Sequence, residues 1–147
     1  LQAYAWYKKS AKQGMHEAEF NLGLMAHYGR GTNQDYVQAM NHYLKASANS
    51  IPEADLNIAF LYHYGLGTSV DYDKSFQYFT KAANHNFPQA QYHLGLLYQN
   101  GHFVKKDLYE ANYWFEKAAE QNLDEAKLMT TALALREPED VDLYIAN

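Results

Sequence analysis

The clearest structural unit of the chain lies in residues 90–119, whose sequence is AQYHLGLLYQNGHFVKKDLYEANYWFEKAA. Its first part, up to Tyr98, spaces apolar residues as a helix with one buried face does. Gly101 predicts the end of that helix, because glycine readily adopts the left-handed conformation found there. Asp107 is a typical N-cap for a second helical run, which continues to Ala118-Ala119. The unit is therefore predicted to be two helices joined by a short loop.

The same pattern recurs along the chain with a fixed period of 36 residues. The columns that show it are Ala18, Ala54, Ala90 and Ala126; Gly29, Gly65 and Gly101; Asp35, Asp71 and Asp107; and Lys45, Lys81 and Lys117. A period of this size is typical of a solenoid, in which each helical hairpin stacks on its neighbours. We therefore predict an all-α fold made of antiparallel helix pairs.

Local signals define the ends of the predicted helices. Asp35 followed by Gln38, and Asp107 followed by Glu110, match a capping box, whereas Asp71 predicts a cap without the box. A column of residues that tolerate positive φ predicts helix ends. Its members are Gly14, Ser50, Asn86 and Asn122. Pro52 and Pro88 follow this column and suit the first position of the next helix.

Small residues recur in the middle of each predicted first helix, at Gly23, Ala59 and Gly95. Glycine inside a helix costs about 1 kcal/mol relative to alanine, so its recurrence predicts a close approach of another helix. We expect that approach at the small residues of the second helix, which are Ala39, Ser75 and Ala111.

The boundaries predicted from these signals make residues 1–136 a repeat domain. Within it, residues 1–14 are the second helix of a truncated repeat, and full repeats cover about 15–50, 51–86 and 87–122. Residues 123–136 are predicted to form a terminal capping helix, and 137–147 a tail. Because the chain begins at Leu1 inside a repeat, we expect a fragment or a processed product, and its compartment and any signal peptide are left open.

Together these residues resemble the Sel1-like repeat, a relative of the tetratricopeptide repeat. The resemblance rests on Ala18-x-x-x-Leu22-Gly23, Gly29-x-Gly31, Asp35, Ala39, Tyr43 and Lys45-Ala46, and most fully on residues 90–119. Phe103 stands where the other loops have a second glycine, so the shape of that loop is left open. Ala26 replaces the tyrosine of Tyr62 and Tyr98. Thr130-Thr131 replace Leu-Gly, which favours a capping role for the last helix.

The resemblance implies a right-handed superhelical solenoid whose first helices line a concave face. It also implies an adaptor or scaffold function, with a protein or peptide partner bound on that face. By this geometry the candidate binding residues are Leu24, Phe60 and Leu96; His27, His63 and Gln99; and Tyr28, Tyr64 and Asn100. Tyrosine and histidine suit such a face because they present an apolar body with a polar tip. The same residues could instead close contacts between repeats. The inward column Phe20, Leu56 and Tyr92 is expected to serve packing.

Several function classes receive no support from the sequence. The formal charge of −5 lacks the basic footprint of a nucleic-acid-binding protein, and no apolar run approaches the length of a membrane-spanning helix. No cysteine is present, and no known catalytic motif was found, so we expect neither an enzyme nor a cofactor. His27 and His63 share a column, but nothing nearby supplies a third metal ligand, so a structural or groove-lining function is favoured over a metal site.

The tail leaves two alternatives open. Pro138 and the apolar residues Val141, Leu143, Tyr144 and Ile145 could form a short helix that caps the end of the solenoid, or a peptide that docks in a groove. Capping is favoured because a solenoid end exposes apolar surface.

For the chain as a whole, the leading hypothesis is an interaction module. The alternatives are a purely structural spacer within a longer protein and, less favoured, an enzyme with an unrecognised site.

Overall fold

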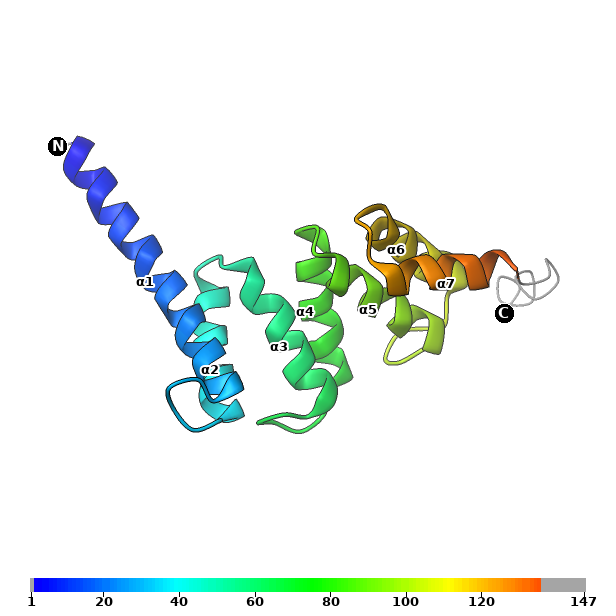
Figure 1. The fold of residues 1–147 in the computed structure, drawn as a ribbon, viewed down its shortest axis with the longest axis horizontal. Helices are drawn as coiled ribbons and strands as arrows, with labels where there is room; N and C mark the ends of the chain where they lie inside the picture. The colour runs from blue at the N-terminus through cyan, green and yellow to red at the C-terminus, as the bar shows by residue number, and fades with distance from the viewer. Residues whose placement is uncertain (1, 136–147) are drawn as a thin grey trace. The chain divides into compact units, whose positions relative to one another are not determined.

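The computed structural model describes residues 2–135, with side chains described from residue 14. Within these residues the chain folds into seven helices and no strand, which confirms the predicted all-α fold class (Figure 1). The helices are α1 (Gln2–Tyr28), α2 (Tyr36–Ala48), α3 (Pro52–Tyr64), α4 (Tyr72–Asn84), α5 (Pro88–Asn100), α6 (Leu108–Glu120) and α7 (Asp124–Ala134). No helix of this part is long and apolar enough to cross a membrane.

The chain divides into two compact units, Leu1–Asp71 and Tyr72–Asn147. In the first unit α2 packs against both α1 and α3. In the second unit α5 packs against α4 and α6, and α6 also packs against α7. Within each unit, helices that are neighbours in the sequence are therefore neighbours in space, as expected for helices joined by short loops.

Positive φ angles close the loops at the same positions in successive repeats. The second loop position has φ of 71° at Gly31, 71° at Gly67 and 66° at Phe103. Phe103 therefore keeps the backbone shape of the glycine loops, although a bulky residue in this region is unusual. Ser50, Asn86 and Asn122 have φ of 64°, 68° and 66°, so the predicted helix-end column is confirmed at these three positions.

The fourth member of that column, Gly14, does not end a helix. The structure has one continuous helix from Gln2 to Tyr28, so the predicted turn at Gly14 is wrong, and residues 2–14 extend α1. Glycine permits a left-handed turn but does not impose one, and the helical hydrogen bonds continue through Gly14.

An apolar stripe on α1 is consequently uncovered. Leu22 and Met25 are 46% and 40% exposed, whereas Ile58 and Leu61, one period later on α3, are fully buried. In the first unit α3 packs against α2, the second helix of the preceding pair. For the second half of α1 the corresponding segment would be residues 2–14, which form the first half of the same helix instead. This stripe consists of Ala18, Leu22, Met25 and Ala26, and of these only Ala26 is buried.

The aspartate caps at Asp35 and Asp107 form as predicted, but the capping boxes do not. The Asp35 carboxylate accepts from the Gln38 N–H at 3.0 Å, and that of Asp107 accepts from the N–H groups of Tyr109 and Glu110. The N–H of Asp35 donates to the Ala26 carbonyl at 2.8 Å, and that of Asp107 to Tyr98 at 3.0 Å. In a capping box the side chain of Gln38 or Glu110 would accept from the N–H of the capping aspartate. Because that N–H already donates to a carbonyl of the preceding helix, it is not available to the box.

Glycine in the first helix makes room for an aromatic ring of the second. A Cβ added to Gly23 would lie 2.6 Å from the Tyr43 ring, and one added to Gly95 would lie 2.6 Å from Phe115. Tyr43 and Phe115 are completely buried. The predicted close approach is therefore confirmed, but its main partner is the ring one turn beyond the small residue. Only at Gly95 does the predicted neighbour also take part, since its added Cβ would lie 3.1 Å from the Ala111 carbonyl oxygen.

Replacing Gly95 with alanine is expected to destabilise the fold. The new methyl group collides with the buried Phe115 ring, and overpacking costs about 1–3 kcal/mol, more than the helix-propensity gain of up to about 1 kcal/mol. Chemical denaturation followed by circular dichroism measures the difference in the free energy of unfolding.

Gly14→Ala is the matched control, because nothing lies within 4 Å of its added Cβ. In the continuous helix this change stabilises by up to about 1 kcal/mol. Equal effects at the two sites would contradict the steric account. A destabilising Gly14→Ala would show that residues 1–14 turn back at this glycine after all.

Candidate functional site

The predicted binding residues lie at equivalent places on three helices. Leu24, His27 and Tyr28 are on α1; Phe60, His63 and Tyr64 on α3; and Leu96, Gln99 and Asn100 on α5. The first two sets belong to the first unit and the third set to the second. Tyr28, Tyr64 and Asn100 are exposed, and the other members are half-buried. Whether they bind a partner stays a prediction.

Two tyrosines of the first unit stand out by exposure and by support. Tyr28 is 54% exposed and Tyr64 is 56% exposed. The Tyr28 ring stacks on His27 with centroids 4.4 Å apart, and the Arg30 guanidinium lies 5.1 Å from its centroid. The Tyr64 ring meets His63 edge-on at 4.8 Å. Each ring therefore combines a large accessible surface with a restricted orientation.

His27 has a structural function in addition to supporting Tyr28. Its Nδ1 lies 3.0 Å from the hydroxyl of Tyr43, whose ring is completely buried. Burial lowers the pKa of His27, and burial raises the pKa of Tyr43 far above its ordinary value. A neutral imidazole can accept the tyrosine O–H, whereas a protonated one cannot. His27 thus satisfies a buried hydroxyl of the hairpin core and is poorly available to a ligand.

Tyr36 is part of this cluster and was missed by the sequence reasoning. Its ring lies edge-on to His27 at 5.4 Å, and its hydroxyl accepts from the Gln34 side chain at 3.0 Å. A Cβ added to Gly67 would lie 2.6 Å from the Tyr36 backbone, so the second loop passes directly over this residue. The available signal was the tyrosine after the capping aspartate, which recurs in Asp71-Tyr72.

Phe20 and Tyr92, two members of the column predicted to serve packing, contact buried aromatic rings of the second helix. The rings of Phe20 and Tyr43 have centroids 5.8 Å apart, and those of Tyr92 and Phe115 are also 5.8 Å apart. In each unit, therefore, an aromatic ring of the first helix contacts the second-helix ring that packs against the glycine, which is Tyr43 at Gly23 and Phe115 at Gly95. These residues are committed to the hairpin core.

Buried polar side chains join successive hairpins. The buried Asp55 accepts from the Ser47 hydroxyl at 2.5 Å. One period later, the fully buried Gln91 donates to Asn86 Oδ1 at 3.1 Å and accepts from Gln121 at 3.0 Å. The sequence reasoning did not single out this column. Since hydrogen bonds between helices account for these groups, they suggest no catalytic chemistry.

The described residues contain no group of three or more His, Cys, Asp and Glu side chains that could hold a metal ion. His27 and His63 lie in the same register, each packed against the tyrosine that follows it. The arrangement offers exposed aromatic surface and hydrogen-bonding groups rather than a reactive centre.

Comparison with known proteins identifies the repeat. A family model described as the Sel1 repeat matches residues 1–15, 16–50, 52–87 and 88–123. A 40-residue segment, 27% of this chain, is 50% identical to an uncharacterized protein of Neisseria meningitidis serogroup B and covers 9% of that protein.

Two crystal structures are also similar. The protein c5321, a protective antigen present in uropathogenic Escherichia coli strains that displays an SLR fold, matches with a TM-score of 0.75 and 38% identity over 85% of this chain. A Sel1 repeat protein from Oxalobacter formigenes matches with a TM-score of 0.74 and 32% identity over 88% of this chain. The chain spans 27% and 53% of these two proteins, respectively.

The environment of His27 predicts a pH dependence of stability. Because its folded pKa is lowered, its contribution is fully present above the ordinary histidine pKa of about 6.5 and is lost as the pH falls below that value. His27→Gln keeps a polar partner for Tyr43 and removes the titration. We expect the free energy of unfolding to fall less steeply for this variant than for the parent chain between about pH 7.5 and 5.5. Parallel pH profiles from urea denaturation would contradict the assignment.

Proposed function

Because the chain belongs to the Sel1 repeat family, whose members generally mediate protein–protein interaction, we propose that it is an interaction module for a protein or peptide partner. We place the binding surface on the predicted columns of the first helices, with Tyr28 and Tyr64 as its anchors. The whole protein would act as an adaptor within a larger complex. Sel1 repeats form a scaffold that is typically non-catalytic, which favours binding over catalysis.

The observation that carries the proposal is the pair of half-exposed tyrosines held in the same register on α1 and α3. Each ring is restrained by the histidine before it, so little side-chain freedom remains to be lost when a partner binds. Tyrosine is also enriched among residues that dominate binding energy. The fold therefore exposes two rigid aromatic surfaces that core packing does not consume.

Charge around these anchors suggests a mixed partner surface. Arg30 lies over Tyr28, while Glu17 and Glu53 are exposed on the same two helices. The dipole of the helix accounts for Glu53 in the first turn of α3. It does not account for Glu17, because α1 begins at Gln2 and places this residue well inside the helix. We infer a partner segment that presents apolar side chains to the tyrosines and a basic group near Glu17.

Removing the two anchors tests the proposal. The variant Tyr28→Ala with Tyr64→Ala is compared with the parent chain as bait in lysate of the source organism, and captured proteins are quantified by mass spectrometry. Truncating two hot-spot tyrosines costs about 2 kcal/mol or more, so the specific partner should be recovered at least about tenfold less. His27 stays intact because its loss would also disturb Tyr43.

Tyr113→Ala is the matched control, since Tyr113 is 49% exposed but lies on α6, a second helix of its pair. Recovery should be lost with the double variant and kept with the control. Equal recovery from all three baits would contradict binding at this surface. A module that captures no specific protein would instead support the spacer hypothesis.

A further inference from the structure

The last hairpin lacks an aromatic side chain that the preceding pair uses. Ala134 on α7 occupies the column of Tyr62 and Tyr98. The Phe76 ring of α4 has two aromatic neighbours. The Tyr98 ring of α5 meets it edge-on with centroids 5.7 Å apart, and the Phe103 ring of the following loop lies 5.9 Å from it. The beginning of α4 is thus covered by one aromatic from the next helix and a second from its loop.

A cavity exists at the corresponding place between α6 and α7. It has a volume of about 230 Å³, and its walls include Leu108, Asn112, Leu133 and Ala134. Asn112 is one period after Phe76, and Ala134 one period after Tyr98, so the cavity lies where the preceding repeat has its aromatic cover. An apolar cavity of roughly 150 Å³ holds a benzene ring. This one has room for a large apolar side chain.

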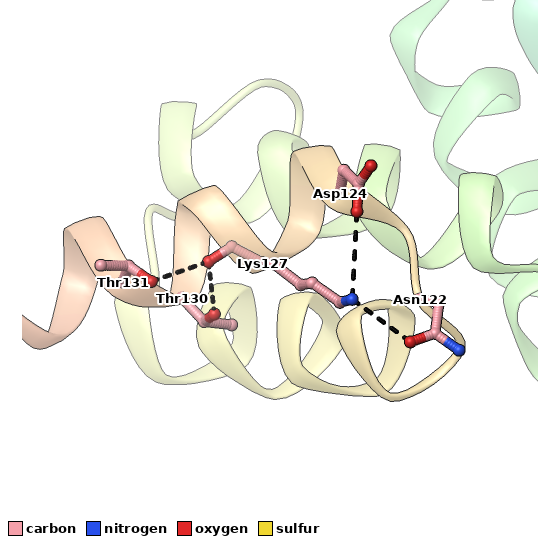
Figure 2. Close-up of polar contacts among 5 residues, drawn as sticks. All are labelled: Asn122, Asp124, Lys127, Thr130 and Thr131. Carbon is pink, nitrogen blue, oxygen red and sulfur yellow. Dashed lines mark hydrogen bonds and ion pairs between the residues drawn. The ribbon is translucent and has the colours of Figure 1, made fainter.

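Several polar groups in or beside the cavity are already hydrogen-bonded within the fold. Figure 2 shows that the hydroxyls of Thr130 and Thr131 both donate to the Lys127 carbonyl, at 2.8 and 3.0 Å. The Lys127 ammonium reaches Asn122 Oδ1 at 3.2 Å and Asp124 at 3.9 Å, on the side of the helix start (Figure 2). Asn112 donates to Glu116 at 2.8 Å. The lining is therefore mixed: Leu108, Leu133 and Ala134 offer apolar contact to an occupant, and Tyr109 and Glu116 add polar groups, the latter an acidic one.

We propose that the apolar segment Val141–Ile145 of this same chain occupies the cavity between α6 and α7. These residues lie outside the described part of the chain. Leu133 and Ala134 line the cavity and directly precede Leu135, the last described residue. The six residues from Leu135 to Val141 reach at most about 20 Å, which is enough to turn back across a single helix pair. The segment supplies four large apolar side chains within five residues.

Charge distinguishes this occupant from the residues just before it. Glu137, Glu139, Asp140 and, within the segment itself, Asp142 would be repelled by the acidic Glu116, so these four side chains are expected to stay in solvent while the apolar side chains enter. Docking driven by apolar burial persists at high salt, because salt screens only the repulsion between Glu116 and the acidic side chains of the tail. A basic partner peptide attracted to Glu116 would instead be released by salt.

Paramagnetic relaxation enhancement tests the proposal in the full chain. Because the chain has no cysteine, Asn147→Cys carries a single nitroxide label. We expect the amide signals of Leu108 and Asn112 to lose most of their intensity, at low and at high salt. The variant Val141→Ser, Leu143→Ser and Ile145→Ser, with the same label, should restore these signals. Its changes lie outside the described helices, so it tests docking without altering them.

Ala134→Tyr provides the second test, because it fills the cavity with the side chain found at Tyr62 and Tyr98. It should also release the label from Leu108 and Asn112, with helical content unchanged by circular dichroism. Signal loss that survives both variants would overturn the proposal. Signal loss only between a nitroxide-labelled chain and a separate isotope-labelled chain would also overturn it, since the occupant would then be a second copy.

Discussion

In both described glycine-bearing hairpins, a buried aromatic ring of the second helix lies directly against a glycine of the first. Tyr43 meets Gly23, and Phe115 meets Gly95. This contact sets how closely the two helices approach, and the remaining features fit that separation. The left-handed loop residues turn the chain within a few positions, and the N–H of the capping aspartate can then bond a carbonyl of the preceding helix. Because both hairpins are fixed in the same way, equivalent residues take equivalent places within each of them.

A partner can use only the side chains that this packing leaves available. His27 and Tyr28 illustrate the division, since they are adjacent and both were expected to bind. His27 is held by the hydroxyl of Tyr43 and belongs to the core, whereas Tyr28 rests on His27 and keeps about half of its surface exposed. On α3 the ring contact recurs between His63 and Tyr64, although Phe79, one period after Tyr43, has no hydroxyl to hold His63 in the same way. The proposed function depends on the outer member of each pair.

Periodicity and backbone preference were enough to predict the all-α repeat, the aspartate caps and the positive φ of Ser50, Asn86 and Asn122. These features depend on local chemistry that each repeat carries in full. The turn predicted at Gly14 was wrong because glycine permits a left-handed conformation without requiring it. Phe103 could not be decided because its strained conformation is supported by the ring of Phe76, a long-range contact. Of the candidate site, the columns could be predicted, but the different burial of His27 and Tyr28 required the hydrogen bond to Tyr43.

A double-mutant cycle between Gly95 and Phe115 tests the central contact most directly. Gly95→Ala is measured in the parent chain and in Phe115→Leu, which removes the ring carbons that lie 2.6 and 2.7 Å from the added Cβ. If the glycine is required by the ring, the destabilisation by alanine disappears or reverses in the leucine background, with a coupling free energy of about 1 kcal/mol or more. Additive effects would contradict the account, because they would mean that the glycine serves some purpose other than admitting the ring.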